Sequence, residues 1–168
     1  GGVLAVLVIT RRHGLPLGTV AGAMAMPLSV AYGIGRIGCF LAGDGTYGKP
    51  TDLPWGMAFP NGAVPVNVPV HPAQLYEAAA AFLIALALWV LQDRIAPIAV
   101  FGSYLVMSGL SRILVELVRI NNPVLLGMTE AQLFGLASII GGIVLIARAR
   151  GAGQTDSPEP APLTTPVA

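Results

Sequence analysis

Two arginines stand inside long apolar stretches of this sequence, where a permanent charge needs a specific purpose. Arg36 lies in the run GRIGCF, and Arg112 lies in the run GLSRILVELVR. A guanidinium at the centre of a bilayer costs at least about 2.5–3.5 kcal/mol, so each must face a carboxylate, a cavity or an anionic ligand. Because a guanidinium presents a planar fork of N–H donors that matches phosphate oxygens, the sequence favours a lipid phosphate as that ligand.

The surroundings of Arg36 leave two interpretations open. The side chain could snorkel to the membrane surface or pair with a carboxylate, as arginines near helix ends often do. However, it lies among Gly33, Gly35 and Gly38, which would allow a ligand or another backbone to approach closely. These glycines argue against simple snorkelling.

Arg112, Glu116 and Arg119 recur at i, i+4 and i+7, a spacing that predicts one polar face on one helix. The carboxylate of Glu116 could neutralise Arg112 in an ion pair that only fixes helix packing. Alternatively, Glu116 orients Arg112 as a second cation that faces a phosphate. Both interpretations remain open at this stage.

A second group of polar residues precedes another apolar stretch. His71 stands before Pro72, where it could act as an acid or base or could simply belong to a loop or cap. Gln74 and Glu77 share one helix face at i and i+3, with Tyr76 beside them, so these side chains could line a common cavity.

Three smaller features are ambiguous. Asp44 and Asp52 could bind a ligand, but aspartate beside glycine or proline more often caps a turn. Cys39 lies one turn from Arg36 and is either a reactive thiol or a small buried side chain. A single cysteine excludes an intrachain disulfide and a cysteine-based zinc cluster, and we expect neither a metal nor another cofactor.

The composition indicates that these residues are positioned by membrane helices. The chain is 55% hydrophobic and 10% charged, with a mean hydropathy of +0.76, whereas soluble domains contain about 25% charged residues. The net charge of +1 gives no indication of nucleic-acid binding. We therefore expect an all-α polytopic membrane protein whose partner is the lipid bilayer.

Four apolar stretches, 18–42, 73–92, 96–117 and 129–147, are long enough to cross a bilayer as helices. Gly1–Thr10 is about half the necessary length, which predicts a partial first helix and an N-terminally truncated chain. Residues 43–72, rich in glycine, proline, aspartate and asparagine, predict a long irregular loop. We expect one transmembrane domain over 1–150 and a disordered tail over 151–168.

The basic residues suggest an orientation, because cytoplasmic segments of membrane proteins carry more lysine and arginine. Alternation of the predicted helices separates them into a group of five and a group of two, namely Arg11, Arg12, Arg94, Arg148 and Arg150 against Lys49 and Arg119. Loop 43–72 would then be extracytoplasmic and the C-terminal tail cytoplasmic.

The ordered set GRIGCFLAGD, YGKPTDLPWGMAFP, HPAQLYEA and GLSRILVELVR resembles the bacterial prolipoprotein diacylglyceryl transferase family, from Gly1 to about Arg150. The resemblance implies a multi-pass enzyme of the inner membrane that performs the first step of lipoprotein maturation. Such an enzyme moves the diacylglyceryl group of phosphatidylglycerol onto the lipobox cysteine thiol of a prolipoprotein and releases glycerol phosphate. Phosphatidylglycerol and prolipoprotein signal peptides are the partners that it implies.

The resemblance also implies roles for individual residues. In the mechanism that it suggests, Arg36 and Arg112 clamp the phosphoglycerol headgroup, and Glu116 orients Arg112. The thiol proton goes to His71 or to a histidine that family members carry in an earlier membrane segment. The matched motif positions that would bind substrate are Arg36, Asp44, Gly48, Gln74, Tyr76, Glu77 and Arg119.

Two departures from the family pattern favour a different function. Family members carry a histidine before a glycine pair that matches Gly1 and Gly2, and they usually carry asparagine at the position of Cys39. A non-catalytic protein that binds lipid or lipoprotein precursors is therefore an alternative. A transporter or channel lined by membrane arginines is a third possibility, but the sequence lacks the inverted repeats typical of that class.

Overall fold

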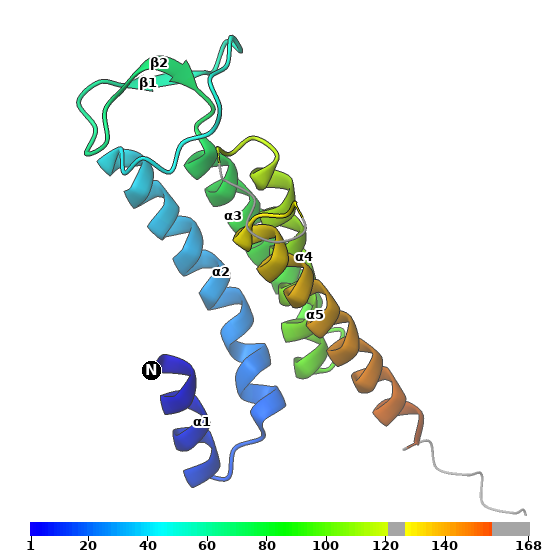
Figure 1. The fold of residues 1–168 in the computed structure, drawn as a ribbon. Coiled ribbons are helices and arrows are strands. Elements are labelled where there is room, and N and C mark those ends of the chain that lie inside the picture. Colours follow the sequence, from blue (N-terminus) through cyan, green and yellow to red (C-terminus); the bar gives the residue numbers. More distant parts are fainter. Residues whose placement is uncertain (121–126, 156–168) are drawn as a thin grey trace, which may run out of the picture.

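The computed structural model describes residues 1–120 and 127–155, which form a set of elongated helices with a small sheet at one end (Figure 1). The elements, in chain order, are α1 (Gly2–Arg12), α2 (Leu17–Ala42), β1 (Met57–Phe59), β2 (Val66–Val70), α3 (Ala73–Leu91), α4 (Pro97–Glu116) and α5 (Glu130–Thr155). Helix α2 packs mainly on α3, and α4 packs mainly on α5.

The predicted membrane spans are confirmed. Four helices within the described residues, α2 to α5, are long and apolar enough to cross a membrane. Their outward surfaces carry large apolar side chains, such as Leu83 at 67% exposure and Trp89 at 59%. Such exposure is expected in a bilayer, because lipid tails are as apolar as these side chains and their contact with lipid costs little free energy.

The structure differs from the sequence prediction at the start of the C-terminal tail and within loop 43–72. Helix α5 continues to Thr155, so the segment predicted to be disordered from residue 151 begins as helix; residues 156–168 lie outside the described part. Loop 43–72 is also not irregular throughout, because β1 and β2 form an antiparallel pair with Met57 opposite Val70. Valine at alternate positions of β2 favours this extended backbone over an irregular loop.

Glycines allow α4 and α5 to approach closely. A Cβ atom on Gly109 would lie 2.4 Å from the carbonyl oxygen of Gly135, and one on Gly142 would lie 2.5 Å from that of Gly102. Small residues at such crossings bring backbones together where no hydrophobic effect drives helix association. This contact fixes the position of α4, the helix that carries Arg112.

The adjacent glycines of α5 provide a matched test of this packing. Gly142→Ala forces a Cβ against the Gly102 carbonyl, whereas Gly141→Ala adds a methyl group to open space. We expect Gly142→Ala to destabilise the protein by about 1–3 kcal/mol, the usual effect of overpacking. Thermal unfolding in detergent should show a clear loss for Gly142→Ala and none for Gly141→Ala; equal melting temperatures would contradict this account of the interface.

Candidate functional site

A buried carboxylate forms the centre of the candidate site. Glu77, in the first turns of α3, is 4% exposed and makes ion pairs with two arginines. Its Oε2 pairs with Arg36 Nε, and its Oε1 lies 3.1 Å from Arg119 Nη1. Since unpaired buried charges are strongly destabilising, this carboxylate compensates the guanidinium groups placed in an apolar environment.

The hydroxyl of Tyr32 joins Arg112 to this pair. It accepts hydrogen bonds from Arg36 Nε at 3.1 Å and from Arg112 Nη1 at 2.9 Å. It also donates to Glu77 Oε2 at 3.0 Å. Side chains from α2, α3 and α4 therefore meet at one oxygen atom. The sequence analysis missed Tyr32, although it stands four residues before Arg36 and thus one helical turn away on the same face.

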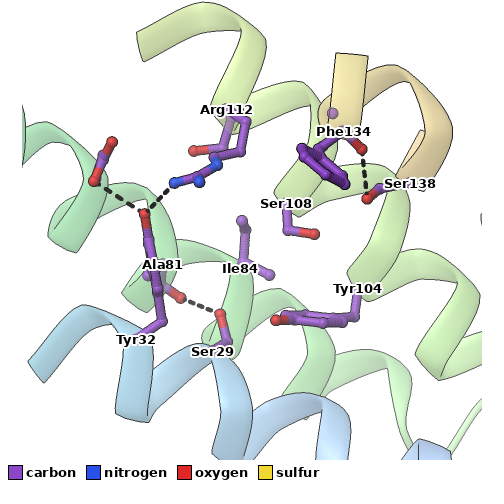
Figure 2. Close-up of a pocket in the computed structure, with 13 residues that line it drawn as sticks. Ser29, Tyr32, Ala81, Ile84, Tyr104, Ser108, Arg112, Phe134 and Ser138 are labelled. Carbon is purple, nitrogen blue, oxygen red and sulfur yellow. Dashed lines mark hydrogen bonds between the residues drawn. The ribbon is translucent and has the colours of Figure 1, made fainter. Parts of the chain in front are cut away.

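A cavity of about 190 Å³ lies beside this network, between α2, α3, α4 and α5. It is lined by Ser29, Tyr32, Glu77, Ala81, Ile84, Tyr104, Ser108, Gly109, Ser111, Arg112, Phe134, Gly135 and Ser138. Figure 2 shows the guanidinium of Arg112 reaching toward the Tyr32 hydroxyl at the margin of this space. Arg36 is not among the described lining residues, so Arg112 is the arginine that the cavity presents to a ligand.

The predicted polar face over Arg112, Glu116 and Arg119 is wrong at its last position. Helix α4 ends at Glu116, and the backbone of Arg119 instead pairs with Gly48 in an isolated bridge. Arg112 donates a hydrogen bond to the Tyr32 hydroxyl. Glu116 is buried, with 6% exposure.

Loop residues explain why α4 ends there. Lys49 donates its backbone N–H to the Val118 carbonyl at 2.7 Å and its Nζ to the Leu117 carbonyl at 3.0 Å. These bonds satisfy carbonyl groups that a helix end leaves without partners. Gly48 permits the close approach, because a Cβ there would lie 2.6 Å from both His71 Cβ and the Val118 carbonyl oxygen. Gly48 therefore has a packing role in this structure.

His71 belongs to a separate cluster. Its Nδ1 lies 3.2 Å from the Tyr76 hydroxyl, which also accepts a hydrogen bond from Trp55 Nε1 at 2.8 Å. None of these side chains is among the described residues that line the cavity beside Arg112. The structure thus brings Arg36, Glu77, Arg112 and Arg119 together but holds His71 on the loop side of α3.

Asp44 closes a turn directly after α2. Its Oδ1 accepts hydrogen bonds from Thr46 N at 3.0 Å and Thr46 Oγ1 at 2.7 Å, and Gln74 Nε2 lies 3.4 Å away. Burial acts to raise the pKa of this carboxyl group, but the hydrogen bonds from Thr46, Cys39 and Gln74 outweigh it and lower the pKa to about 2. Asp44 is therefore ionised in the folded protein at neutral pH.

Carboxylates, histidines and the cysteine are spread apart in this site. Across the residues that the structure describes, no three of them form a group that could hold a metal ion. The cationic groups of the site are instead the three arginine side chains around Tyr32 and Glu77.

Comparisons with known proteins agree with the motifs. The sequence profile of the family described as prolipoprotein diacylglyceryl transferase matches residues 1–148. Relatives named phosphatidylglycerol–prolipoprotein diacylglyceryl transferase include proteins of Nitrobacter winogradskyi (36% identity, covering 94% of this chain and 57% of the relative), Pseudomonas putida (36%, 87% and 57%) and Methylococcus capsulatus (38%, 89% and 60%). The chain thus spans between 57% and 60% of the length of these relatives.

Removal of the central carboxylate should destabilise the helix bundle. Glu77→Gln leaves Arg36 and Arg119 without their counter-ion, and we expect a loss of about 3–5 kcal/mol, as measured for broken buried pairs. Asp52→Asn is the control, because it removes a carboxylate from an exposed loop position. Melting temperatures in detergent should fall strongly for the first variant only; similar values for both would show that Glu77 is not the counter-ion we describe.

Asp44 should give the protein a specific sensitivity to acid. Because folding lowers its pKa from 3.8 to about 2, its stabilising contribution is complete above about pH 5 and disappears as the pH falls toward about 2. Thermal unfolding of wild type and Asp44→Asn across this range should therefore show a difference that is constant near neutral pH and vanishes in acid. A difference that does not change with pH would assign the effect to something other than ionisation.

Proposed function

The chain belongs to the prolipoprotein diacylglyceryl transferase family, and from this membership we propose that it transfers the diacylglyceryl group of phosphatidylglycerol to the lipobox cysteine thiol of a prolipoprotein. The names of the curated relatives support this activity. The observation from this chain that carries the proposal is the Arg112 guanidinium, which faces a cavity between membrane helices and is held by a neutral hydroxyl.

The lining of the cavity suits a phosphoglycerol headgroup. Three serines in it each donate their single hydroxyl proton to a backbone carbonyl, namely Ser29 to Ala81, Ser108 to Leu105 and Ser138 to Phe134. Each hydroxyl then keeps lone pairs that can accept hydrogen bonds from a ligand. The cavity therefore combines a cation for a phosphate with acceptors for the hydroxyl groups of a polyol.

In the proposed reaction, the cysteine thiolate attacks the glycerol carbon that carries the phosphate ester. A C–S bond forms while the C–O bond breaks, and the bonding electrons leave with the oxygen of glycerol phosphate. Arg112 stabilises the negative charge that develops on this leaving group, and Arg36 adds positive potential through the shared Tyr32 hydroxyl. Such preorganised charge is usually the largest contribution to catalysis of this kind.

The thiol proton needs an acceptor on the side from which the peptide arrives. We assign this role to His71, whose Nδ1 lies 3.2 Å from the Tyr76 hydroxyl; in the tautomer whose Nδ1–H donates to Tyr76, Nε2 has the free lone pair that takes the proton. A histidine suits the task because its ordinary pKa lies close to physiological pH. The neighbouring exposed Trp55 would then contact the lipoprotein precursor at the membrane surface.

The four apolar helices and the family indicate a multi-pass membrane protein. We propose that it lies in the bacterial inner membrane, with loop 43–72 outside and the C-terminal tail in the cytoplasm. The asymmetry of basic residues supports this orientation, since Arg11 and Arg12 end α1 at the opposite end of the molecule from the β1–β2 sheet (Figure 1).

Arg112 is the residue to test first. In the protein produced from its natural gene, with phosphatidylglycerol vesicles and a lipobox peptide, Arg112→Ala should lower kcat/KM by about 100- to 1000-fold, because a developing charge loses its stabilising donor. Arg112→Lys should retain part of the activity, since it keeps the charge but loses the planar fork. The transfer rates of both variants are measured by mass spectrometry of the thioether product and of the released glycerol phosphate.

Arg94→Ala provides the control, since it removes an exposed arginine near the opposite end of α3. It should transfer at the wild-type rate. Wild-type activity in Arg112→Ala would remove this residue from the mechanism. Binding of phosphatidylglycerol without any thioether product in the wild type would support the non-catalytic alternative.

A further inference from the structure

We propose that Tyr32 is a positioning residue of this site, whose hydroxyl holds the side chains of Arg36 and Arg112 in different places. It keeps Arg36 with Glu77 and directs Arg112 into the cavity. This inference rests on the proposed function, because it concerns the arginine that would meet the phosphate of the lipid. The Tyr32 hydroxyl is the group that holds Arg112 in place.

The hydrogen-bonding capacity of the hydroxyl is fully used. A phenol has one O–H donor and two acceptor lone pairs. The donor goes to Glu77 Oε2 at 3.0 Å, and the lone pairs receive Arg36 Nε at 3.1 Å and Arg112 Nη1 at 2.9 Å. Each of the three charged groups therefore depends on this oxygen, and none of them can move without breaking a bond to it.

Tyr32 also separates Arg112 from a carboxylate. Glu77 Oε2 is bonded to the same hydroxyl that accepts from Arg112, so the tyrosine lies between the two charges. Within the part of the chain that is described, this hydroxyl is the hydrogen-bond partner of the Arg112 guanidinium. A neutral partner leaves the positive charge available to a phosphate, whereas a direct ion pair would compete with it.

The ring of Tyr32 has a separate contact that a test can preserve. The Arg36 Cζ atom lies 5.3 Å from the ring centroid, within the range of a cation–π interaction. Tyr32→Phe keeps this ring and removes only the hydroxyl. The variant therefore separates the hydrogen bonds from the packing of the side chain.

The experiment compares Tyr32→Phe with wild type in the natural full chain, with rates normalised to the folded fraction from size-exclusion chromatography. We expect kcat/KM for phosphatidylglycerol to fall about 10- to 100-fold, because a small displacement of a catalytic group has effects of this size. Tyr47→Phe is the matched control, since among the described residues its hydroxyl bonds the Val64 carbonyl in the loop and no side chain of the site. It should behave as wild type.

A double-mutant cycle identifies the partner through which the hydroxyl acts. In an Arg112→Lys background, the 2.9 Å hydrogen bond from Arg112 Nη1 to the Tyr32 hydroxyl is already lost. Tyr32→Phe should then lower kcat/KM by less than about threefold if the two residues act as one unit. The full loss in that background, or wild-type activity of Tyr32→Phe alone, would overturn the proposal.

The positioning role of Tyr32 can be tested even if the wild type has no transferase activity. If the wild type produces no thioether, the readout becomes binding to phosphatidylglycerol vesicles, compared with vesicles of phosphatidylcholine alone. Weaker binding of Tyr32→Phe that depends on Arg112 then supports the positioning role without catalysis. Unchanged binding overturns that role.

Discussion

One carboxylate between two guanidinium groups is the interaction on which the arrangement of helices depends. Glu77 is almost fully buried and pairs with Arg36 from α2 and with Arg119 beyond α4. Charges inside an apolar bundle are tolerated only with partners in suitable geometry, so these pairs determine which faces of α2 and α3 meet. The Tyr32 hydroxyl extends the same network to Arg112 and to the cavity.

The sequence predicted the helices well because the length of an apolar run is a direct consequence of bilayer thickness. It also identified each charged member of the network, since an arginine within such a run is conspicuous. It failed where long-range backbone pairing decides the outcome. Arg119 leaves the helical face because residues 48 and 49 pair with the end of α4, and no periodicity within residues 112–119 contains that information.

The sequence analysis missed Tyr32, the neutral member of the network, for a related reason. A tyrosine one turn from Arg36 has the correct spacing, but only the folded structure shows that its oxygen also reaches residues 77 and 112. Likewise, pattern matching assigned His71 and Arg112 to one reaction, whereas the structure places them in separate hydrogen-bonded groups. Chemistry proposed for both must therefore join a thiol from the loop side with a lipid from between the helices.

The pairing of Gly48 and Lys49 with the end of α4 links loop 43–72 mechanically to the ion pairs. The backbone of Arg119 is bridged to Gly48, while its guanidinium holds Glu77. A force that displaces the loop would therefore pull on the buried carboxylate, and through Tyr32 it would reach Arg112. Displacement of loop 43–72 would in this way change the electric field in the cavity beside Arg112.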